Sequence, residues 1–172
     1  MDFDAIENAI HAWVVASSGL LAANVIWAGQ GGPEPTGRYI AIRLPGLRRL
    51  GSDWKEYAGG VANVVTQRGV RTMTLSLQAF NGPPLGNNSN LATLERVISA
   101  SDLDLLAAGG VGLGPVGAIT VIDGDRSSLL DPRAVVDVTI HLASERTGTG
   151  TTIEHVEVQN QMAGTTVVID RP

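Results

Sequence analysis

The sequence predicts an α+β fold in which two main helices pack on one face of a mostly antiparallel sheet. Segments with strand character cluster between helical ones instead of alternating with them one by one. The strands also alternate apolar with polar residues, as in a sheet that keeps one face against solvent or a partner. The most regular strand runs from Val70 to Phe80, and its apolar side consists of Met73, Leu75, Leu77 and Ala79. We therefore expect this strand to be central, with other strands beside it and helices against its apolar side.

Composition narrows the class of protein. A chain of 172 residues is long enough for one domain with a sizeable core, and the core must be mainly aliphatic because aromatics make up only 4% of the residues. The absence of cysteine excludes disulfides, thiolate zinc sites and a cysteine nucleophile. The chain has no apolar run long enough for a membrane helix, and its acidic start (Asp2, Asp4 and Glu7) is unlike a signal peptide. A net charge of −5 without a visible basic stripe argues against gripping nucleic acid as the main role.

The first third of the chain predicts a helix followed by short strands. The helix runs from Asp2 to about Ala16, because Phe3, Ile6, Ile10, Trp13 and Val14 have helical spacing. Asp2 or Asp4 caps it, and Gly19 ends it in the left-handed conformation. Asn24–Ala28 is a strand, and Gly29–Gly37 continues neither element because of its prolines and glycines.

Three further segments lead into the central strand. Tyr39–Leu44 alternates as a strand, with Ile40, Ile42 and Leu44 on one face. Leu47–Gly60 is interpreted as a long excursion away from the sheet. Val61–Thr66 and Val70–Phe80 flank Gln67–Gly69, which resembles a hairpin turn with Gly69 at the position that needs positive φ.

The middle of the chain predicts the second helix and another strand. Asn81–Asn90 is a loop, after which Leu91, Leu94, Val97 and Ile98 mark a helix capped by Asn90. A further helical turn runs from Ser101, which forms a capping box with Asp104, to Ala108, and Gly109–Gly110 ends it. Ala118–Ile122 is a strand and Asp123–Pro132 a turn-rich connection.

The last part predicts a long antiparallel hairpin and a tail. Ala134–Leu142 alternates, with Val136, Val138, Ile140 and Leu142 inward, and a polar loop, Ser144–Gly150, leads to a second strand, Thr152–Val158. We expect residues 1–158 to form one domain and residues 159–172 a C-terminal extension. Its β-prone run, Thr165–Ile169, either pairs within its own sheet or docks on a partner.

Short motifs offer little chemistry. Gly112–Gly117 matches GxGxxG but follows a helix and opens a strand, the reverse of the context that binds a pyrophosphate, so we interpret it as a flexible loop. Asp123-Gly124-Asp125 lacks the other ligands of a calcium loop and is interpreted as a turn. His11, His141 and His155 have no metal-ligand spacing, although His141 and His155 could be cross-strand neighbours.

No enzyme class is indicated. The sequence contains neither a GxSxG nucleophile elbow nor a P-loop. We therefore predict no catalytic, cofactor-binding or metal residues, no cofactor and no enzymatic activity. Trp13, Trp27 and Trp54 are interpreted as core or interface anchors rather than as a platform for stacking bases.

A family resemblance supplies the functional prediction. The chain resembles the neck and tail terminator proteins of tailed bacteriophages over most of residues 1–158, including the initial helix. The residues that carry the resemblance are Ile26-Trp27-Ala28, Gln30, Pro33, Pro35, Gly37, Tyr39, Gly69, Arg71, Leu75 to Phe80, Pro132-Arg133-Ala134, Asp137-Val138, and Thr152-Ile153-Glu154 through Val158.

The resemblance implies a structural virion subunit, made in the host cytoplasm, that forms a ring at the top of the tail tube, typically a homohexamer. Such a ring ends tail polymerisation and joins the tail to the head connector. The implied partners are further copies of itself, the tail tube protein, the connector, in some phages the tail sheath, and DNA that passes through the lumen without sequence-specific contact. A negative net charge suits such a lumen because it keeps DNA from sticking, and no membrane is involved. Gly29–Gly37 and Leu47–Gly60, long for internal connections, are the segments expected to reach a neighbouring subunit.

Two alternatives stay open. Another head–tail connector or head-completion protein would share the fold style and the lack of an active site, and imaging the particle would show which ring the protein occupies. A soluble small-molecule-binding domain or enzyme would instead be a monomer or dimer with an enclosed polar pocket.

Overall fold

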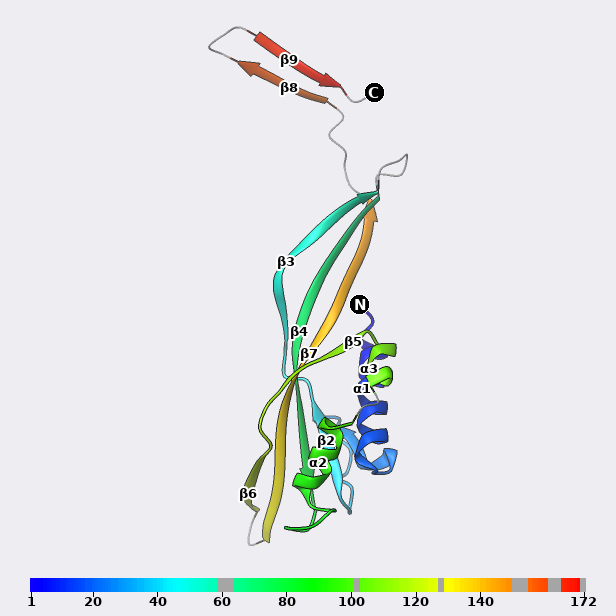
Figure 1. Ribbon diagram of the computed structural model, residues 1–172, viewed down its shortest axis with the longest axis vertical. Coiled ribbons are helices and arrows are strands. Elements are labelled where there is room, and N and C mark those ends of the chain that lie inside the picture. Colours follow the sequence, from blue (N-terminus) through cyan, green and yellow to red (C-terminus); the bar gives the residue numbers. More distant parts are fainter. Residues whose placement is uncertain (59–63, 101–102, 127–128, 150–154, 161–164, 171–172) are drawn as a thin grey trace. The chain divides into compact units, whose positions relative to one another are not determined.

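A computed structural model describes residues 1–58, 64–100, 103–126, 129–149, 155–160 and 165–170 of the chain (Figure 1). Within these residues the fold is α+β, with three α-helices, a mixed and mostly antiparallel sheet of seven strands, and a separate sheet of two strands. The chain divides into two compact units, one of residues 1–53 with 69–144 and one of residues 54–68 with 145–172. The predicted fold class is therefore confirmed, while the placement of two helices on one face of the sheet stays a prediction.

Helix α1 (Phe3–Ser18) begins as predicted and continues past the predicted end near Ala16 to Ser18, just before the expected terminator Gly19. The Asp2 carboxylate accepts a hydrogen bond from the backbone N–H of Ala5 at 3.2 Å, which satisfies one of the free amides of the first turn. Gly19 follows the last turn with φ of 69°, a conformation that glycine adopts without steric cost. The 3-10 turn η1 (Ala22–Asn24) then leads into the sheet.

The large sheet is organised around one long strand. Its strands, in chain order, are β1 (Val25–Trp27), β2 (Tyr39–Arg43), β3 (Leu47–Ala58), β4 (Val64–Phe80), β5 (Val111–Val116), β6 (Thr120–Arg126) and β7 (Leu129–Thr149). The hydrogen-bonded path is β1-β2-β4-β7-β5, with β3 also paired to β4 and β6 also paired to β7. Strands β1 and β2 are parallel, whereas β2 with β4, β5 with β7 and β6 with β7 are antiparallel. The predicted central position of the Val70–Phe80 strand is confirmed.

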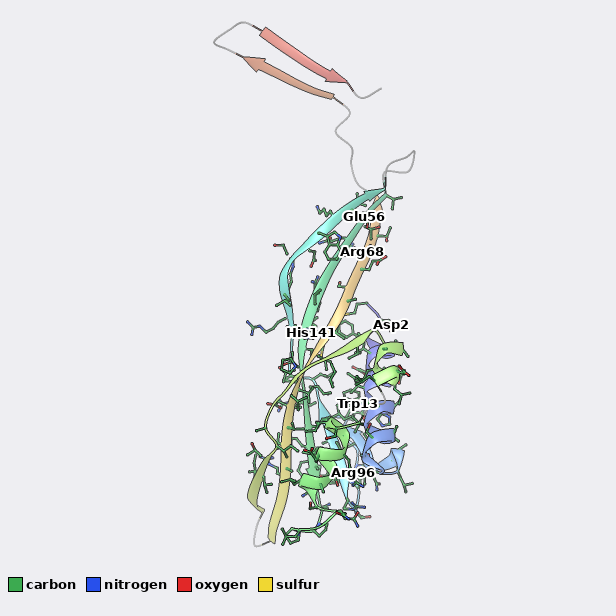
Figure 2. The ribbon with its side chains drawn as sticks, viewed as in Figure 1. Asp2, Trp13, Glu56, Arg68, Arg96 and His141 are labelled. Atoms are coloured by element: carbon green, nitrogen blue, oxygen red, sulfur yellow. The ribbon has the colours of Figure 1, made fainter. Side chains whose placement is uncertain are left out.

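One hydrophobic core joins the helices to this sheet. Alternation along β4 buries Met73, Leu75, Leu77 and Ala79, and alternation along β7 buries Val136, Val138, Ile140 and Leu142. Helix α1 contributes Trp13, which is fully buried and faces the strands (Figure 2). Since each of these side chains lies in the same cluster, burial of apolar surface is what holds the helices and the sheet together.

Two further helices complete this core. Helix α2 (Asn90–Ile98) buries Leu94 and Val97, and the short helix α3 (Leu103–Ala108) buries Leu106. The cap of α2 is Ser89 and not Asn90 as predicted, since Ser89 Oγ accepts from the N–H of Ala92 at 3.2 Å. Asn90 Oδ1 instead accepts from the N–H of Gly82 at 2.9 Å. The predicted capping Ser101 lies outside the described residues.

Two predictions about the segment before the central strand are wrong. Leu47–Gly60 does not leave the sheet, because residues 47–58 form β3 and pair with β4. Its residues up to Glu56 are almost all exposed, so it lacks the one-sided apolar pattern that identifies a strand. Gln67–Gly69 is not a turn either, because β4 runs through it without interruption and Gly69 has no positive φ. Residues 59–63 lie outside the described part.

Three predicted loops are also strands. Gly112–Gly117, interpreted as flexible, is mostly β5, which pairs with β7 through a bulge between Leu113 and Val116. Asp123–Pro132 is largely the β6–β7 hairpin, with Asp123 opposite Pro132. Ser144–Gly150 continues β7 up to Thr149. These segments are strands because their backbones pair with neighbouring strands, and not because they bury one apolar face. Their composition is typical of turns, which is why the sequence predicted loops.

The second unit contains a small hairpin of its own. Strands β8 (His155–Asn160) and β9 (Thr165–Asp170) pair antiparallel in a two-stranded sheet. The predicted pairing of Ala134–Leu142 with Thr152–Val158 is therefore wrong, because the partner of β8 is β9. In the same unit Arg68 makes ion pairs with Glu56 and Glu145, each at 3.1 Å, and Figure 2 shows Arg68 close to Glu56.

Candidate interaction site

A second, smaller apolar cluster lies beside β2 and β4. Because side chains alternate along β2, Ile40 and Ile42 enter the main core while Tyr39 and Ala41 belong to this separate cluster. Tyr39 lies opposite Phe80 in the β2–β4 ladder, and their rings stack with centroids 4.8 Å apart at 12°. Stacking adds to the area that the two rings bury, so the pair forms a rigid floor.

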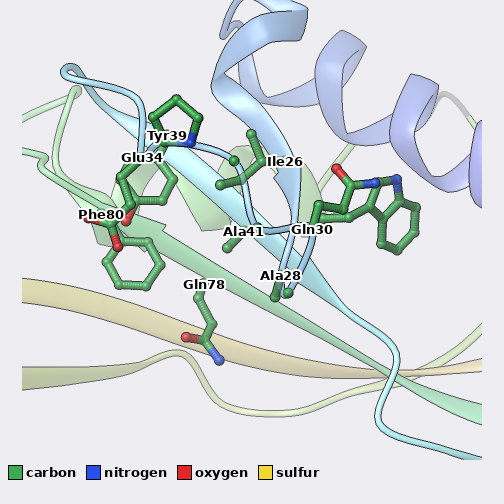
Figure 3. Close-up of a pocket in the computed structure, with 13 residues that line it drawn as sticks. Ile26, Ala28, Gln30, Glu34, Tyr39, Ala41, Gln78 and Phe80 are labelled. Carbon is green, nitrogen blue, oxygen red and sulfur yellow. The ribbon is translucent and has the colours of Figure 1, made fainter.

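The segment 28–38 closes a cleft over this floor (Figure 3). Its start extends the β1–β2 pairing, since the N–H of Ala28 donates to the carbonyl of Ile42 at 2.8 Å. Gly29 and Gly31 then turn the chain with φ of 93° and 70°. The cleft has a volume of about 320 Å³, and its lining comprises Ile26, Trp27, Ala28, Gly29, Gln30, Gly31, Gly32, Pro33, Glu34, Tyr39, Ala41, Gln78 and Phe80.

The far end of the segment is tied to the loop before α2. Arg38 Nη1 donates to the carbonyl and the side-chain oxygen of Asn88, at 3.3 and 3.2 Å. Asn81 Nδ2 donates to the carbonyl of Gly37 at 3.2 Å. These contacts hold the segment at both ends, which leaves the glycine-rich stretch between them to shape the cleft.

The lining is suited to binding rather than to acid–base chemistry. It offers one carboxylate, Glu34, and the amides of Gln30 and Gln78 around an apolar floor, but no histidine, serine or threonine. An apolar body with a few polar groups is typical of a site that accepts a side chain or a small ligand. Most of the residues between Ile26 and Tyr39 that carry the family resemblance line this cleft together with Gln78 and Phe80.

The other resemblance residues near the middle of β4 surround a buried carboxylate. The side chain of Asp53 on β3 is only 6% exposed, and Arg71 donates to both of its oxygens, at 2.6 and 2.8 Å. Arg49 lies 3.3 Å from the same carboxylate. Hydrogen bonding to Asp53, aided by the charge of that carboxylate, raises the pKa of Arg71 against the lowering effect of burial. A bidentate pair of this kind fixes the register between β3 and β4.

Gly69 makes room for this ion pair. A methyl group on its Cα would overlap Asp53 Oδ1 and would lie 2.7 Å from Arg71 Nη1. The sequence therefore contains glycine here because of a close approach and not because of a turn. Gly114 on β5 has a similar reason, since an added Cβ would lie 2.7 Å from His141 Nε2.

The histidines do not gather. His11 Nε2 lies 2.9 Å from the carbonyl of Val25 and connects α1 to β1. His141 is opposite Gly112 in the β5–β7 ladder, whereas His155 is opposite Asp170, so the suggested cross-strand pair is wrong. No group of three or more His, Cys, Asp or Glu that could hold a metal ion lies within the described residues.

The tryptophans have different environments. Trp13 is in the core, Trp27 packs against it and lines the cleft, and Trp54 is 56% exposed. Sequence reasoning missed the Tyr39–Phe80 stack and the Asp53–Arg71 pair, because each joins residues from strands whose register was unknown. Aromatic residues at the ends of two predicted strands were the one available signal.

Comparisons with known proteins give a family match. The family model described as "phage neck terminator protein" matches residues 4–166. The comparison with curated proteins found no match. Among the helices that the structure describes, none has the length and apolar character needed to cross a membrane.

Proposed function

The chain belongs to the phage neck terminator protein family, and on that basis we propose that its copies form a closed ring, typically sixfold, at the top of the tail tube. Membership gives the protein a structural role in the phage neck and a place in the virion. The ring ends tube polymerisation, and its partners are the tube protein, the head connector and, in a contractile tail, the sheath. DNA passes through its lumen without sequence-specific contact, and the chain is made in the host cytoplasm.

The observation that carries this proposal is the family match over residues 4–166. A ring of identical copies needs two different surfaces on each copy that fit each other. Strand β3 supports this requirement, because Leu47 and Leu50 are exposed on it. Large exposed apolar side chains are typical of a surface that a partner covers.

We assign the cleft under segment 28–38 to contact with another neck protein. Its rigid aromatic floor and amide rim would receive an apolar side chain, and the two glycines of positive φ allow the segment to adjust around it. Within this proposal the C-terminal residues 159–172 also serve a partner.

Light scattering over a concentration series, with and without purified tail tubes, tests the proposal. A single copy has a mass of 17.9 kDa, so a sixfold ring is easily separated from a monomer or dimer. Electron microscopy of the assembled material should show a closed ring capping the tube. A strict monomer that also fails to bind tubes would refute the terminator role, and a ring at another position in the particle would assign the protein to a different joint of the neck.

A further inference from the structure

Positive charge is concentrated in one stretch of a chain that is negative overall, so the expectation that the sequence has no basic stripe is wrong. Seven of the twelve cationic residues lie between Arg38 and Arg71, where the only acidic residues are Asp53 and Glu56. This stretch therefore carries a net charge of +5, although the whole chain carries −5. Acidic residues outnumber cationic ones over the rest of the chain, so the two signs of charge are unevenly distributed along the sequence.

One face of the first unit in this stretch is both basic and apolar. We call it the basic strip, and it consists of Arg43, Arg48, Leu50 and Val70, all of them exposed. Arg43 lies opposite Ser76 in the β2–β4 ladder, and Arg48 borders Thr72 and Thr74 on the same side of β4. Leu47 and Arg49 alternate to the other side of β3, where Arg49 contacts Asp53. Neither Arg43 nor Arg48 makes an ion pair with another described residue, and exposed apolar side chains beside such arginines have the composition of an interface.

A surface of opposite charge and similar apolar content lies at the start of α1 and on α3. We call it the acidic end, and it consists of Phe3, Asp4, Glu7, Leu103, Asp104 and Leu105, again all exposed. The two helices are in contact, and Gly109, just after α3, lies so close to α1 that an added Cβ would be 2.5 Å from Ala9 Cβ. Phe3 and Leu103 are 47% and 45% exposed. Apolar side chains beside carboxylates here match Leu50 and Val70 beside the arginines of the strip.

The two surfaces are not joined within one copy. No ion pair among the described residues connects the strip to the acidic end. Each copy therefore presents two complementary surfaces that remain for another copy to cover. A head-to-tail contact between two different patches closes into a ring when the rotation from copy to copy completes a full turn, and otherwise continues as an open filament.

We propose that the basic strip of one copy docks against the acidic end of the next copy, and that this contact builds the ring. The inference rests on the proposed function, since it names the subunit interface of that ring. Burial of the leucines and of Phe3 drives the association, while the charges set its direction and exclude a strip-to-strip contact.

Charge reversal on each surface tests the interface. One variant carries Arg43→Glu and Arg48→Glu, and a second carries Asp4→Lys and Glu7→Lys. Alone, each variant should need about a hundredfold more protein than the wild type to form rings, because like charges then face each other. A control with Arg96→Glu and Arg146→Glu changes the net charge by as much as the first variant, at exposed positions on neither surface, and should assemble as the wild type does.

Mixing the two variants provides the decisive result. In an alternating ring the reversed strip meets the reversed acidic end, and the native strip meets the native acidic end, so every contact is complementary. We expect an equimolar mixture to form rings at close to the wild-type concentration, which also shows that both variants are folded. Variants that assemble alone like the wild type, or a mixture of variants with wild-type melting temperatures that fails to assemble, would overturn the interface while leaving the ring proposal intact. A wild-type protein that stays monomeric and also fails to bind tubes would refute the proposed function instead.

Discussion

Replacing Gly69 by alanine should destabilise the protein, because the added methyl group overlaps a neighbouring side chain and not because of backbone conformation. Gly69 lies inside β4 without a positive φ, so its backbone is open to any L-residue. The added methyl would overlap the Asp53 carboxylate and lie 2.6 Å from its Cγ. Asp53 is nearly buried and held by Arg71 through two hydrogen bonds, so it cannot move aside without breaking that pair.

The size of the effect follows from two opposing contributions. Forcing an extra methyl into a packed site costs about 1–3 kcal/mol. Alanine recovers about 0.4–1 kcal/mol because it restricts the unfolded chain more than glycine does. The difference is a loss of roughly 1–2 kcal/mol, and the melting temperature of a chain of this size should fall by roughly 2–8 °C.

Thermal melting of Gly69→Ala, Asp53→Ala and the double variant tests the reasoning. Removing the Asp53 carboxylate frees the space, so the double variant should be more stable than the sum of the two single losses by at least ~0.5 kcal/mol. Gly69→Asn should be worse than Gly69→Ala, whereas a turn glycine would tolerate asparagine better. Additive single effects, or an asparagine variant more stable than alanine, would refute the proposed close approach.

Three other substitutions or deletions have defined outcomes. Leu77→Ala should lower the free energy of unfolding by about 2–5 kcal/mol, because the side chain is fully buried. Thr74→Ala, at an exposed position of the same strand, should change it little. Equal losses for the two variants in denaturant titrations would mean that the register of the strand is wrong. Ser89→Ala should lower the free energy of unfolding by about 1 kcal/mol, because α2 loses its N-cap. An unchanged midpoint of denaturant unfolding would contradict the role of Ser89 as the cap. Removing residues 155–172 should leave the melting temperature of the monomer unchanged but weaken binding to neck partners; a large fall in melting temperature with unaltered assembly would show that the β8–β9 hairpin only stabilises its own chain.

The cleft gives a further test. Gln30→Arg places a long cation at its exposed rim and should weaken binding to tubes or connector in a pull-down without changing the melting temperature. Asn87→Arg, at an exposed loop position outside the lining, is the matched control. Equal binding by both variants would exclude the cleft as a contact surface.

The elements that were predicted best from the sequence are those that bury a single face, because burial of one face sets the spacing of their apolar residues. Helix α1 and strand β4 each pack one side into the main core, so their apolar residues recur with the period of the element. The ends of α1 were also predictable, since Asp2 and Gly19 act on their own backbone neighbourhood.

Strand β3 could not be predicted in this way. Its leucines and Trp54 are exposed, and pairing to β4 supplies its order, so no alternation marks it. The same holds for β5, where Gly114 reflects close approach to β7 because an added Cβ would lie 2.9 Å from the carbonyl oxygen of Thr139. Composition alone does not distinguish a glycine that turns the chain from one that makes room for a neighbour.

The candidate site was predictable only in its parts. Segment 29–37 was correctly interpreted as neither helix nor strand, and Tyr39 and Phe80 were placed on strands. Their stacking depends on the β2–β4 register, and the Asp53–Arg71 pair depends on the position of an unrecognised strand. The strip and the acidic end become surfaces only once exposure is known for each side chain.

The parallel pairing of β1 with β2 limits which insertions and deletions the connecting segment, residues 28–38, can accept. After Trp27 the chain must return to the starting end of β1 before β2 can begin at Tyr39. Residues 28–38 make that return. Parallel strands need a connection of about a dozen residues or more, so this one is close to the minimum. A deletion would pull the strands out of register, whereas each doubling of the loop costs only ~0.6 kcal/mol of closure entropy. Natural variants should therefore gain residues here far more often than lose them, and the fold should tolerate an engineered peptide tag at this position even where the tag blocks the cleft from a partner.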